Sequence, residues 1–281
     1  MAHTVYDLAV ALDAVAGFDS ADLWTANSLG QMPMEHYVSF LDPHGLRGAR
    51  VGVLKEAWDF SPCDPEVVEL ARQAIGVFGE HDAFVFDPVS LGVDLPNYLE
   101  TNSSPSRYER IHAINQYLAR QGPEYPFKTA SELLLDHPGV PGRPQDREHI
   151  EHLVDLDRDP KYRATLEGKR RLREMVVSLM DRYGVDALIY PHKLHGPLKI
   201  GPREDPERAY QPNQLSPNTG LPALIVPMGF TPSGLPVGLE LLGRPWSEPI
   251  LLKLARGFEA VTANRRVPDS TPPLEGECFD Y

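Results

Sequence analysis

The sequence predicts an α/β protein whose mixed, largely parallel sheet is flanked by helices. Short apolar runs rich in Val, Ile and Leu alternate along the chain with segments of helical periodicity, as crossover-linked strands do. With 281 residues and 42% hydrophobic content, the chain is long enough to bury a substantial core. We expect residues 1–281 to form one domain.

An amphipathic helix is predicted at the start of the chain. Thr4 and Asp7 have the spacing of a capping box, and Gly17 follows as a stop signal. Apolar residues recur at the spacing of one helical face: Val5, Leu8, Ala9, Leu12, Val15 and Ala16.

A β-α-β unit is predicted next. "RVGVL" at 50–54 and "AFVFDPV" at 83–89 are typical of strands. The helix between them, over 64–81, has Asp64 as its N-cap and Pro65 at its first position. Because such crossovers are right-handed within one sheet, we expect the two strands to be parallel neighbours.

The middle of the chain is predicted to be mostly helical. "SRYERIHAINQYLARQG" at 106–122 indicates one helix, and the charged segment 158–184 indicates a long helix that ends at Gly184. Between them, the Pro, Gly and charged residues of 137–149 predict a surface loop.

The last third of the chain returns to strands. "DALIYP" at 186–191 predicts a buried strand, and a long irregular stretch at 192–215 is typical of a functional loop. Within 216–248, apolar runs flank a Pro-Ser-Gly break and predict a hairpin, although their prolines do not suit a central strand. A final helix is predicted to be capped by Ser247, with one apolar stripe: Ile250, Leu251, Leu254, Ala255 and Phe258.

Composition excludes several classes of partner. A formal net charge of −13 argues against nucleic acid and against an anionic membrane surface. Two cysteines, Cys63 and Cys278, do not form a disulfide framework of the secreted kind, although sequence alone leaves their pairing open. No basic leader region and no uncharged run of about 18 residues occurs, so we expect a cytoplasmic protein.

Most motifs that suggest chemistry have a simpler structural explanation. The histidines of "EHIEH" (148–152) match neither H-E-x-x-H nor H-x-x-E-H, so a solvated helix start is favoured over a metal site. Ser103 and Ser104 precede a Pro and a helix, where hydroxyls usually act as caps. No G-x-S-x-G, Walker or dinucleotide fingerprint occurs, and we expect no cofactor and no metal.

Two histidines occupy a position where α/β proteins place ligands. His192 and His195 in "PHKLHG" follow directly after a predicted strand end. They are either pocket residues that bind a substrate or structural loop histidines.

Several ordered segments resemble the C-terminal portion of amidase signature family enzymes. "TGLPALIVPMGF", "GLPVGLELLGRPWSE" and "LLKLARGFE" resemble that portion's sheet and final helix, in the family's order. "MAHTVYDLAVALDAVAGFDSAD", "GLRGARVGVLKE" and "DALIYP" resemble the helix after the catalytic core, the next strand and a late strand. The resemblance covers residues 1–268 and implies a truncated amidase-signature fold.

The resemblance also implies that the catalytic part of the fold is missing here. Family members hydrolyse amides with a Lys and two serines, and the serines lie in a Gly/Ser-rich tract before the helix that opens this chain. The sequence has no such tract, and its first lysine is Lys55. Without an activated nucleophile and oxyanion donors, the main interactions that accelerate amide hydrolysis are missing.

Three functional interpretations therefore stay open. The chain is the back portion of an amide hydrolase, or a pseudoenzyme that binds a ligand or partner, or a small-molecule pocket repurposed for isomerisation or cyclisation. In each case no catalytic residue is assigned, and the ligand expected is a small amide or carboxylate.

One arginine is assigned to substrate binding by the resemblance. "ETNSSPSRYERI" (100–111) is similar to the E-A-S-S-N-L-A-R-Y-D-G-I stretch of the family's glutamine-hydrolysing members, whose arginine contacts a carboxylate; Arg107 takes that place. The alternative is a surface ion pair with Glu100 or Glu109. We expect Arg107 to face a pocket shared with residues 191–215 and with Asn218 and Thr219, where the hairpin begins.

The absence of the catalytic portion also predicts that the chain associates with another chain. Leaving about 600 Å² of apolar sheet in water forgoes about 15 kcal/mol, an upper estimate comparable to the whole stability of a domain. We therefore expect a homo-oligomer, most simply a dimer, or a partner chain that covers the exposed sheet.

Overall fold

The computed structural model describes residues 1–102, 105–137, 146–151, 153, 155–197 and 211–266. The chain divides into two compact units, Met1–Pro96 with Arg173–Tyr281, and Asn97–Leu172. Each is described by itself, and the prediction of one domain over 1–281 stays a prediction.

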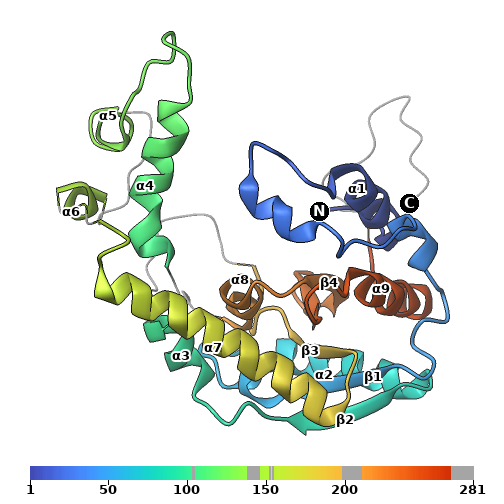
Figure 1. Ribbon diagram of the computed structural model, residues 1–281. Helices are drawn as coiled ribbons and strands as arrows, with labels where there is room; N and C mark the ends of the chain where they lie inside the picture. Colours follow the sequence, from blue (N-terminus) through green and yellow to red (C-terminus); the bar gives the residue numbers. More distant parts are fainter. Residues whose placement is uncertain (103–104, 138–145, 152, 154, 198–210, 267–281) are drawn as a thin grey trace. The chain divides into compact units, whose positions relative to one another are not determined.

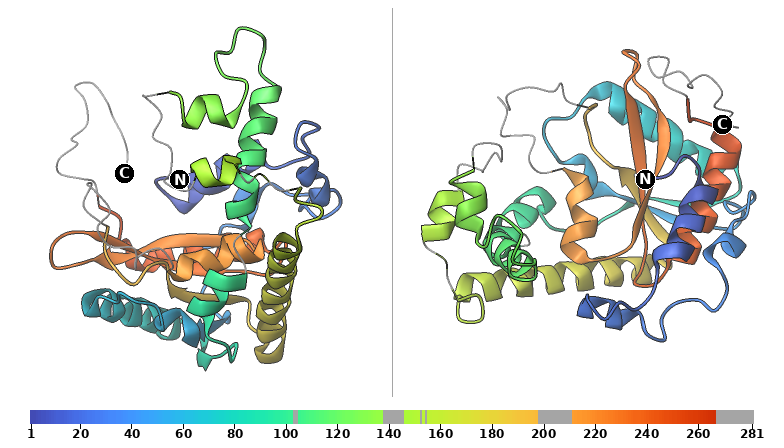
Figure 2. Two further views of the ribbon diagram at one scale, coloured as in Figure 1. Left: turned by 90° about the vertical axis from the view of Figure 1, so that its left-hand side faces the viewer. Right: turned by 90° about the horizontal axis from the view of Figure 1, so that it is seen from above.

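The first unit contains a five-stranded mixed sheet in the order β2-β1-β3-β5-β4 (Figures 1 and 2). β1 pairs in parallel with β2 and with β3, whereas β5 is antiparallel to both β3 and β4. The predicted α/β class and the parallel β-α-β unit are thus confirmed. The strands are β1 (Arg50–Leu54), β2 (Phe84–Val89), β3 (Ala187–Pro191), β4 (Ala223–Phe230) and β5 (Pro236–Leu242).

Two helices pack against one face of this sheet, α2 (Pro65–Glu80) and α9 (Glu248–Thr262), and α1 (Val5–Val15) packs on α9. The core between them combines alternate residues of the strands, such as Val53, Ile189 and Leu239, with apolar helix faces. The aromatic rings of Phe78 in α2 and Phe258 in α9 stack at its centre, with centroids 5.4 Å apart.

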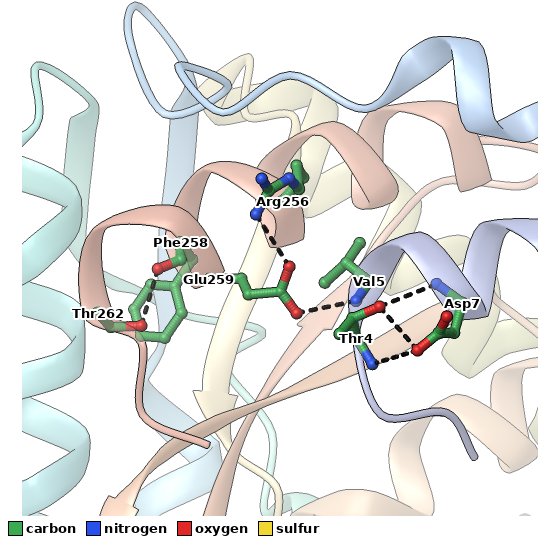
Figure 3. Close-up of polar contacts among 7 residues, drawn as sticks. All are labelled: Thr4, Val5, Asp7, Arg256, Phe258, Glu259 and Thr262. Atoms are coloured by element: carbon green, nitrogen blue, oxygen red, sulfur yellow. Dashed lines mark hydrogen bonds and ion pairs between the residues drawn. The ribbon is translucent and has the colours of Figure 1, made fainter. Parts of the chain in front are cut away.

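The predicted capping box of α1 is confirmed. Thr4 Oγ1 accepts the Asp7 amide at 3.0 Å, and Asp7 Oδ2 accepts the Thr4 amide at 3.2 Å (Figure 3). Glu259 of α9 accepts the Val5 amide at 2.8 Å, and this bond joins the two helices (Figure 3). Val15 is 78% exposed, so its placement in the buried stripe was wrong; the buried face ends one turn earlier.

Asp64 and Ser247 are the N-cap residues of α2 and α9, as predicted, but neither makes a side-chain cap bond. The Ser247 hydroxyl donates to the Arg244 carbonyl at 2.7 Å, and Asp64 Oδ2 accepts the Gly196 amide at 3.3 Å, so neither side chain caps its helix. In α9, Ile250 is 42% exposed, whereas the rest of the predicted stripe is buried. The Ser247 side chain bonds within a local turn instead, and the Asp64 side chain bonds a loop that is distant in the sequence.

The predicted hairpin forms with an irregularity at its prolines. The register between β4 and β5 shifts between Pro227 and Gly229, and Gly229 has a φ of 143°. Within the described residues β4 pairs with β5 alone, so it is an edge strand, where a proline is tolerated because no ladder hydrogen bond is lost on the open side.

Only one face of β4 is covered. Leu224, Val226 and Met228 are buried against the helices, whereas the alternate residues Ala223, Ile225 and Pro227 are exposed. Because successive side chains of a strand point to opposite faces, an apolar strip of the sheet faces outward here.

The second unit is helical. It contains α4 (Ser106–Ala119), α5 (Ala130–Leu134) and α6 (Asp146–Glu151), whereas α3 (Leu95–Asn102) and α7 (Pro160–Tyr183) extend across its limits. Arg110 holds the buried Asp146 with two bonds of 3.0 Å. Burial, followed by the Glu109 carboxylate, raises the pKa of Tyr162 to about 12. The predicted loop 137–149 was wrong at its end, where α6 begins, and 138–145 lie outside the described residues.

Short helical turns complete the description: η1 (Leu23–Ser28), η2 (Tyr37–Phe40), η3 (Lys55–Trp58), η5 (Pro212–Gln214) and α8 (Leu215–Thr219).

Gly257 allows a close approach that gives a stability prediction. A Cβ at this position of α9 would lie 2.8 Å from the Leu46 amide nitrogen. We expect Gly257→Ala to lower the free energy of unfolding by about 1–3 kcal/mol in urea titrations. Gly76→Ala in α2 is the control, because no described atom lies within 4 Å of its Cβ; it should add about 0.5–1 kcal/mol. Equal effects of the two changes would contradict the packing.

Candidate functional site

The candidate site lies where β3 ends. In a sheet with parallel strands, ligands bind beyond the carboxyl ends of those strands, and His192 directly follows Pro191, the last residue of β3. The His192 amide donates to the Gly238 carbonyl at 2.9 Å, and the Asn213 amide donates to the His192 carbonyl at 3.0 Å. The backbone of His192 is therefore held between β5 and η5.

A buried carboxylate orients the His192 ring. Glu240 of β5 is 2% exposed, and its Oε2 lies 2.7 Å from His192 Nδ1. Its Oε1 accepts the hydroxyl of Tyr190 in β3 at 3.0 Å. Both carboxylate oxygens thus have a partner, which a charge buried in a strand requires.

Tyr190 is a hydrogen-bond donor to this carboxylate. Its side chain is fully buried, and burial, followed by the nearby Glu240 charge, raises the pKa of Tyr190 well above its ordinary value. The phenol therefore stays protonated and donates its hydrogen to Glu240.

Strand register places this group beside the uncovered face of β4. Glu240 is directly opposite Tyr190 on one side and Ile225 on the other, so the three side chains share one face of the sheet. A Cβ at Gly238 would lie 2.6 Å from Ile225 Cγ2 and 4.0 Å from His192 Cβ. Gly238 therefore allows Ile225 to pack closely on the strand, because a side chain at this position would overlap Ile225 Cγ2; Ile225 is 50% exposed and the His192 side chain is 29% exposed.

The second predicted histidine points inward. His195 is 4% exposed, and its Nδ1 lies 2.7 Å from the Gly196 carbonyl oxygen. Its Nε2 is buried and has no hydrogen-bond partner among the described residues. The adjoining loop is fixed by Gln211, whose side chain accepts the Leu194 amide at 3.0 Å.

Asn218 and Thr219 are both buried in α8. Asn218 Nδ2 donates to the Gln214 carbonyl, and Thr219 Oγ1 donates to the Leu215 carbonyl, each at 2.8 Å. These bonds stabilise the short helix itself. The role of both residues in substrate binding stays a prediction.

Arg107 lies on α4 in the second unit, whereas the other predicted site residues belong to the first unit. Its side chain and residues 198–210 lie outside the described part of the chain. The predicted pocket that joins Arg107 to residues 191–215 therefore stays a prediction.

The remaining motifs add no site. Glu148 and His149 lie in α6, whereas His152, Ser103 and Ser104 lie outside the described residues. Among the described residues, no group of three metal-ligating side chains occurs. No helix in that part of the chain is both long and apolar enough to cross a membrane.

Sequence reasoning missed Glu240 and Tyr190. A lone glutamate inside the apolar run "GLPVGLELLG" was the available signal, because a charged residue in a buried strand needs a partner. Its partners are not apparent from sequence, since the pairing of β5 with β3 joins residues about fifty positions apart.

Comparison with known proteins decides the family. The family model described as Amidase matches residues 1–252. The chain belongs to the amidase signature family. The structure of a bacterial aryl acylamidase of that family is 20% identical with a TM-score of 0.63, over 92% of this chain and 51% of that chain, and it supports the fold alone.

Two relatives that share more of the sequence than the aryl acylamidase does are named as an amidotransferase subunit and as an amidase. A glutamyl-tRNA(Gln) amidotransferase subunit from Moorella thermoacetica is 30% identical over 94% of this chain and 54% of its own length. The peptide amidase of Stenotrophomonas maltophilia is 29% identical with a TM-score of 0.74, over 95% of this chain and 53% of that chain. The chain thus spans about half the length of the relatives that it matches.

Proposed function

We propose that this chain is the substrate-lining part of an amide hydrolase and does not hydrolyse amides by itself. The acyl-transfer groups are supplied by a complementary part of the fold, which covers the exposed sheet face. The observation that carries this proposal is the half-covered edge strand β4, with Ile225 50% exposed in a sheet whose strands β1 and β3 are almost entirely buried. An apolar strand face of this kind is normally covered.

The polar chemistry of the chain supports the same proposal. Acyl transfer needs a nucleophile in contact with a base, together with donors aimed at an oxyanion. The hydroxyls of Ser90, Ser216 and Ser247 instead donate to a carboxylate or to backbone carbonyls, as structural hydroxyls do. The first lysine of the sequence, Lys55, follows β1.

We expect the purified chain to hydrolyse aryl amides no faster than buffer and to remain unlabelled by a serine-directed fluorophosphonate. The reason is that the described hydroxyls of Ser90, Ser216 and Ser247 are held by structural bonds and not by a Lys or His base. Amide turnover is followed by release of the aryl amine, and labelling by intact mass. Robust turnover together with one labelled serine would refute the proposal.

A second candidate function has one observation in its favour. An imidazole oriented by a buried carboxylate is the arrangement of a general base, and His192 has it with Glu240. A repurposed pocket that isomerises or cyclises a small molecule would use such a base without a serine nucleophile. An activity assay distinguishes the two functions. Amide hydrolysis requires a complementary part of the fold, whereas isomerisation or cyclisation would be catalysed by this chain alone.

A further inference from the structure

We propose that a cavity beside β2 binds a small zwitterion of the α-amino acid class that carries an apolar side chain. The cavity has a volume of about 390 Å³ and lies where β1 and β2 end. Its lining residues are Lys55, Trp58, Asp59, Arg72, Asp87 and Pro88. This inference goes beyond the proposed function and does not depend on it.

The cavity and the candidate site around His192 lie on opposite faces of the sheet. Asp87 of β2 bonds Arg72 of α2, so the cavity is on the face that the helices cover. Glu240 directly follows Leu239, whose side chain belongs to the core under those helices. Because successive side chains of a strand alternate between faces, Glu240 points to the other side. A ligand in the cavity is therefore separate from the Glu240–His192 pair.

One wall of the cavity is fixed by two contacts of Arg72. Its Nη1 lies 2.8 Å from Asp87 Oδ2, and its guanidinium carbon lies 4.2 Å from the centroid of the Trp58 ring. The ion pair neutralises one charge of each sign, and the stacking holds the indole in place. These two charges thus already have partners before a ligand binds.

The other two charges at the cavity are unpaired. Lys55 and Asp59 are both exposed, and neither side chain has an ion-pair or hydrogen-bond partner among the described residues. Although they are only four positions apart, they do not pair with each other. The cavity therefore presents one ammonium group and one carboxylate that are both available to a ligand.

This pair of charges selects the class of ligand. A ligand with both a carboxylate and an ammonium group satisfies Lys55 and Asp59 together, whereas a singly charged ligand leaves one of them unpaired. The charges of the four ionised lining residues sum to zero, so the cavity favours neither an anion nor a cation. An α-amino acid is a small zwitterion that carries both groups on one carbon.

The size of the cavity and its apolar wall determine what else the ligand carries. Ligand pockets measure about 300–1,000 Å³, so this cavity suits a small molecule. Pro88 and the part of the Trp58 indole that Arg72 leaves uncovered supply apolar surface beside the charges. An apolar side chain of the amino acid would pack on that surface.

The test compares L-leucine with two analogues that each lack one of its charges, 3-methylbutylamine and 4-methylpentanoate. Each is titrated at millimolar concentration into the full chain labelled with ¹⁵N-tryptophan, and the indole resonance of Trp58 is assigned with Trp58→Phe. We expect leucine to shift this resonance with a Kd about three- to tenfold lower than that of either analogue. The resonance of Trp24, which is 83% exposed in η1, should not move. No response of Trp58 to leucine, or equal affinity for leucine and an analogue, would overturn the proposal.

Lys55→Met and Asp59→Asn identify the partner of each ligand group. Lys55→Met should weaken leucine and 4-methylpentanoate about three- to tenfold without weakening 3-methylbutylamine, which has no carboxylate. Asp59→Asn should weaken leucine and 3-methylbutylamine by a similar factor without weakening 4-methylpentanoate. Both positions are exposed, so the variants should fold. A folded variant that keeps the leucine affinity of the unmodified chain contradicts the proposal.

Lys161→Met and Asp136→Asn are the matched controls. Both residues are exposed in the second unit, and within the described part of the chain neither side chain has a partner. These variants should bind leucine as the unmodified chain does. Weakening equal to that in the cavity variants would mean that leucine responds to net charge alone, and would refute the site. Because no turnover is measured, failure of the proposed function leaves this result unaffected.

Discussion

At micromolar concentration, light scattering coupled to size exclusion is expected to show an assembly larger than the 31.3 kDa chain. The reason is the amount of apolar side chain left in water. Large exposed hydrophobic residues occur on β4 and also across the N-terminal segment: Tyr6, Val10, Val15, Phe18, Leu23, Trp24, Leu29 and Met34. Apolar side chains exposed in this number favour an interface, and a two-fold dimer is its simplest form.

Ile225→Lys separates the two candidate surfaces. If the uncovered face of β4 forms the contact, a lysine there should shift the protein toward the monomer, because a charge would be buried at the interface. Trp24→Lys is the matched change in η1, where Trp24 is 83% exposed. A well-folded monomer that binds no hydrophobic dye would contradict the assembly prediction.

Phe78→Ala is expected to lower the free energy of unfolding by about 3–5 kcal/mol. Phe78 is completely buried and stacks on the equally buried Phe258, so its removal leaves a cavity between α2 and α9. That loss is a large part of a typical domain's 5–15 kcal/mol. Urea unfolding measures it.

Phe18→Ala is the control for this change. Phe18 is 51% exposed, and its removal should alter stability by about 0.5 kcal/mol or less. A small effect at Phe78 would mean that α2 and α9 do not share one core.

Local rules predicted much of the first unit. The Thr4 capping box depends on residues three positions apart, and the parallel pairing of β1 and β2 follows from a short crossover through α2. The hairpin β4–β5 likewise follows from two apolar runs around a turn. In each case the determining contacts are close in the sequence.

Exposure at helix edges was harder to predict. Val15 and Ile250 fit the helical period, yet both are exposed, because the width of the buried stripe depends on which elements the helix meets. The bond that the Asp64 side chain accepts from the Gly196 amide was equally unpredictable, because it depends on a loop that is distant in the sequence.

The candidate site shows this limit most clearly. The strand end and His192 were predictable, since a histidine after an apolar strand is visible in the sequence. The role of Glu240 was not, because it depends on β5 lying between β3 and β4 in the sheet. Long-range strand order joins the residues that matter, and no local pattern encodes it.

A chimera tests the central claim most directly. In it, this chain replaces the part of the Stenotrophomonas maltophilia peptide amidase that it matches, and the proposal requires the remaining part of that protein to supply the acyl-transfer groups. The account predicts a cooperatively folding chimera that hydrolyses a peptide amide, whereas this chain alone does not. A folded chimera with no turnover above either part alone would contradict the account.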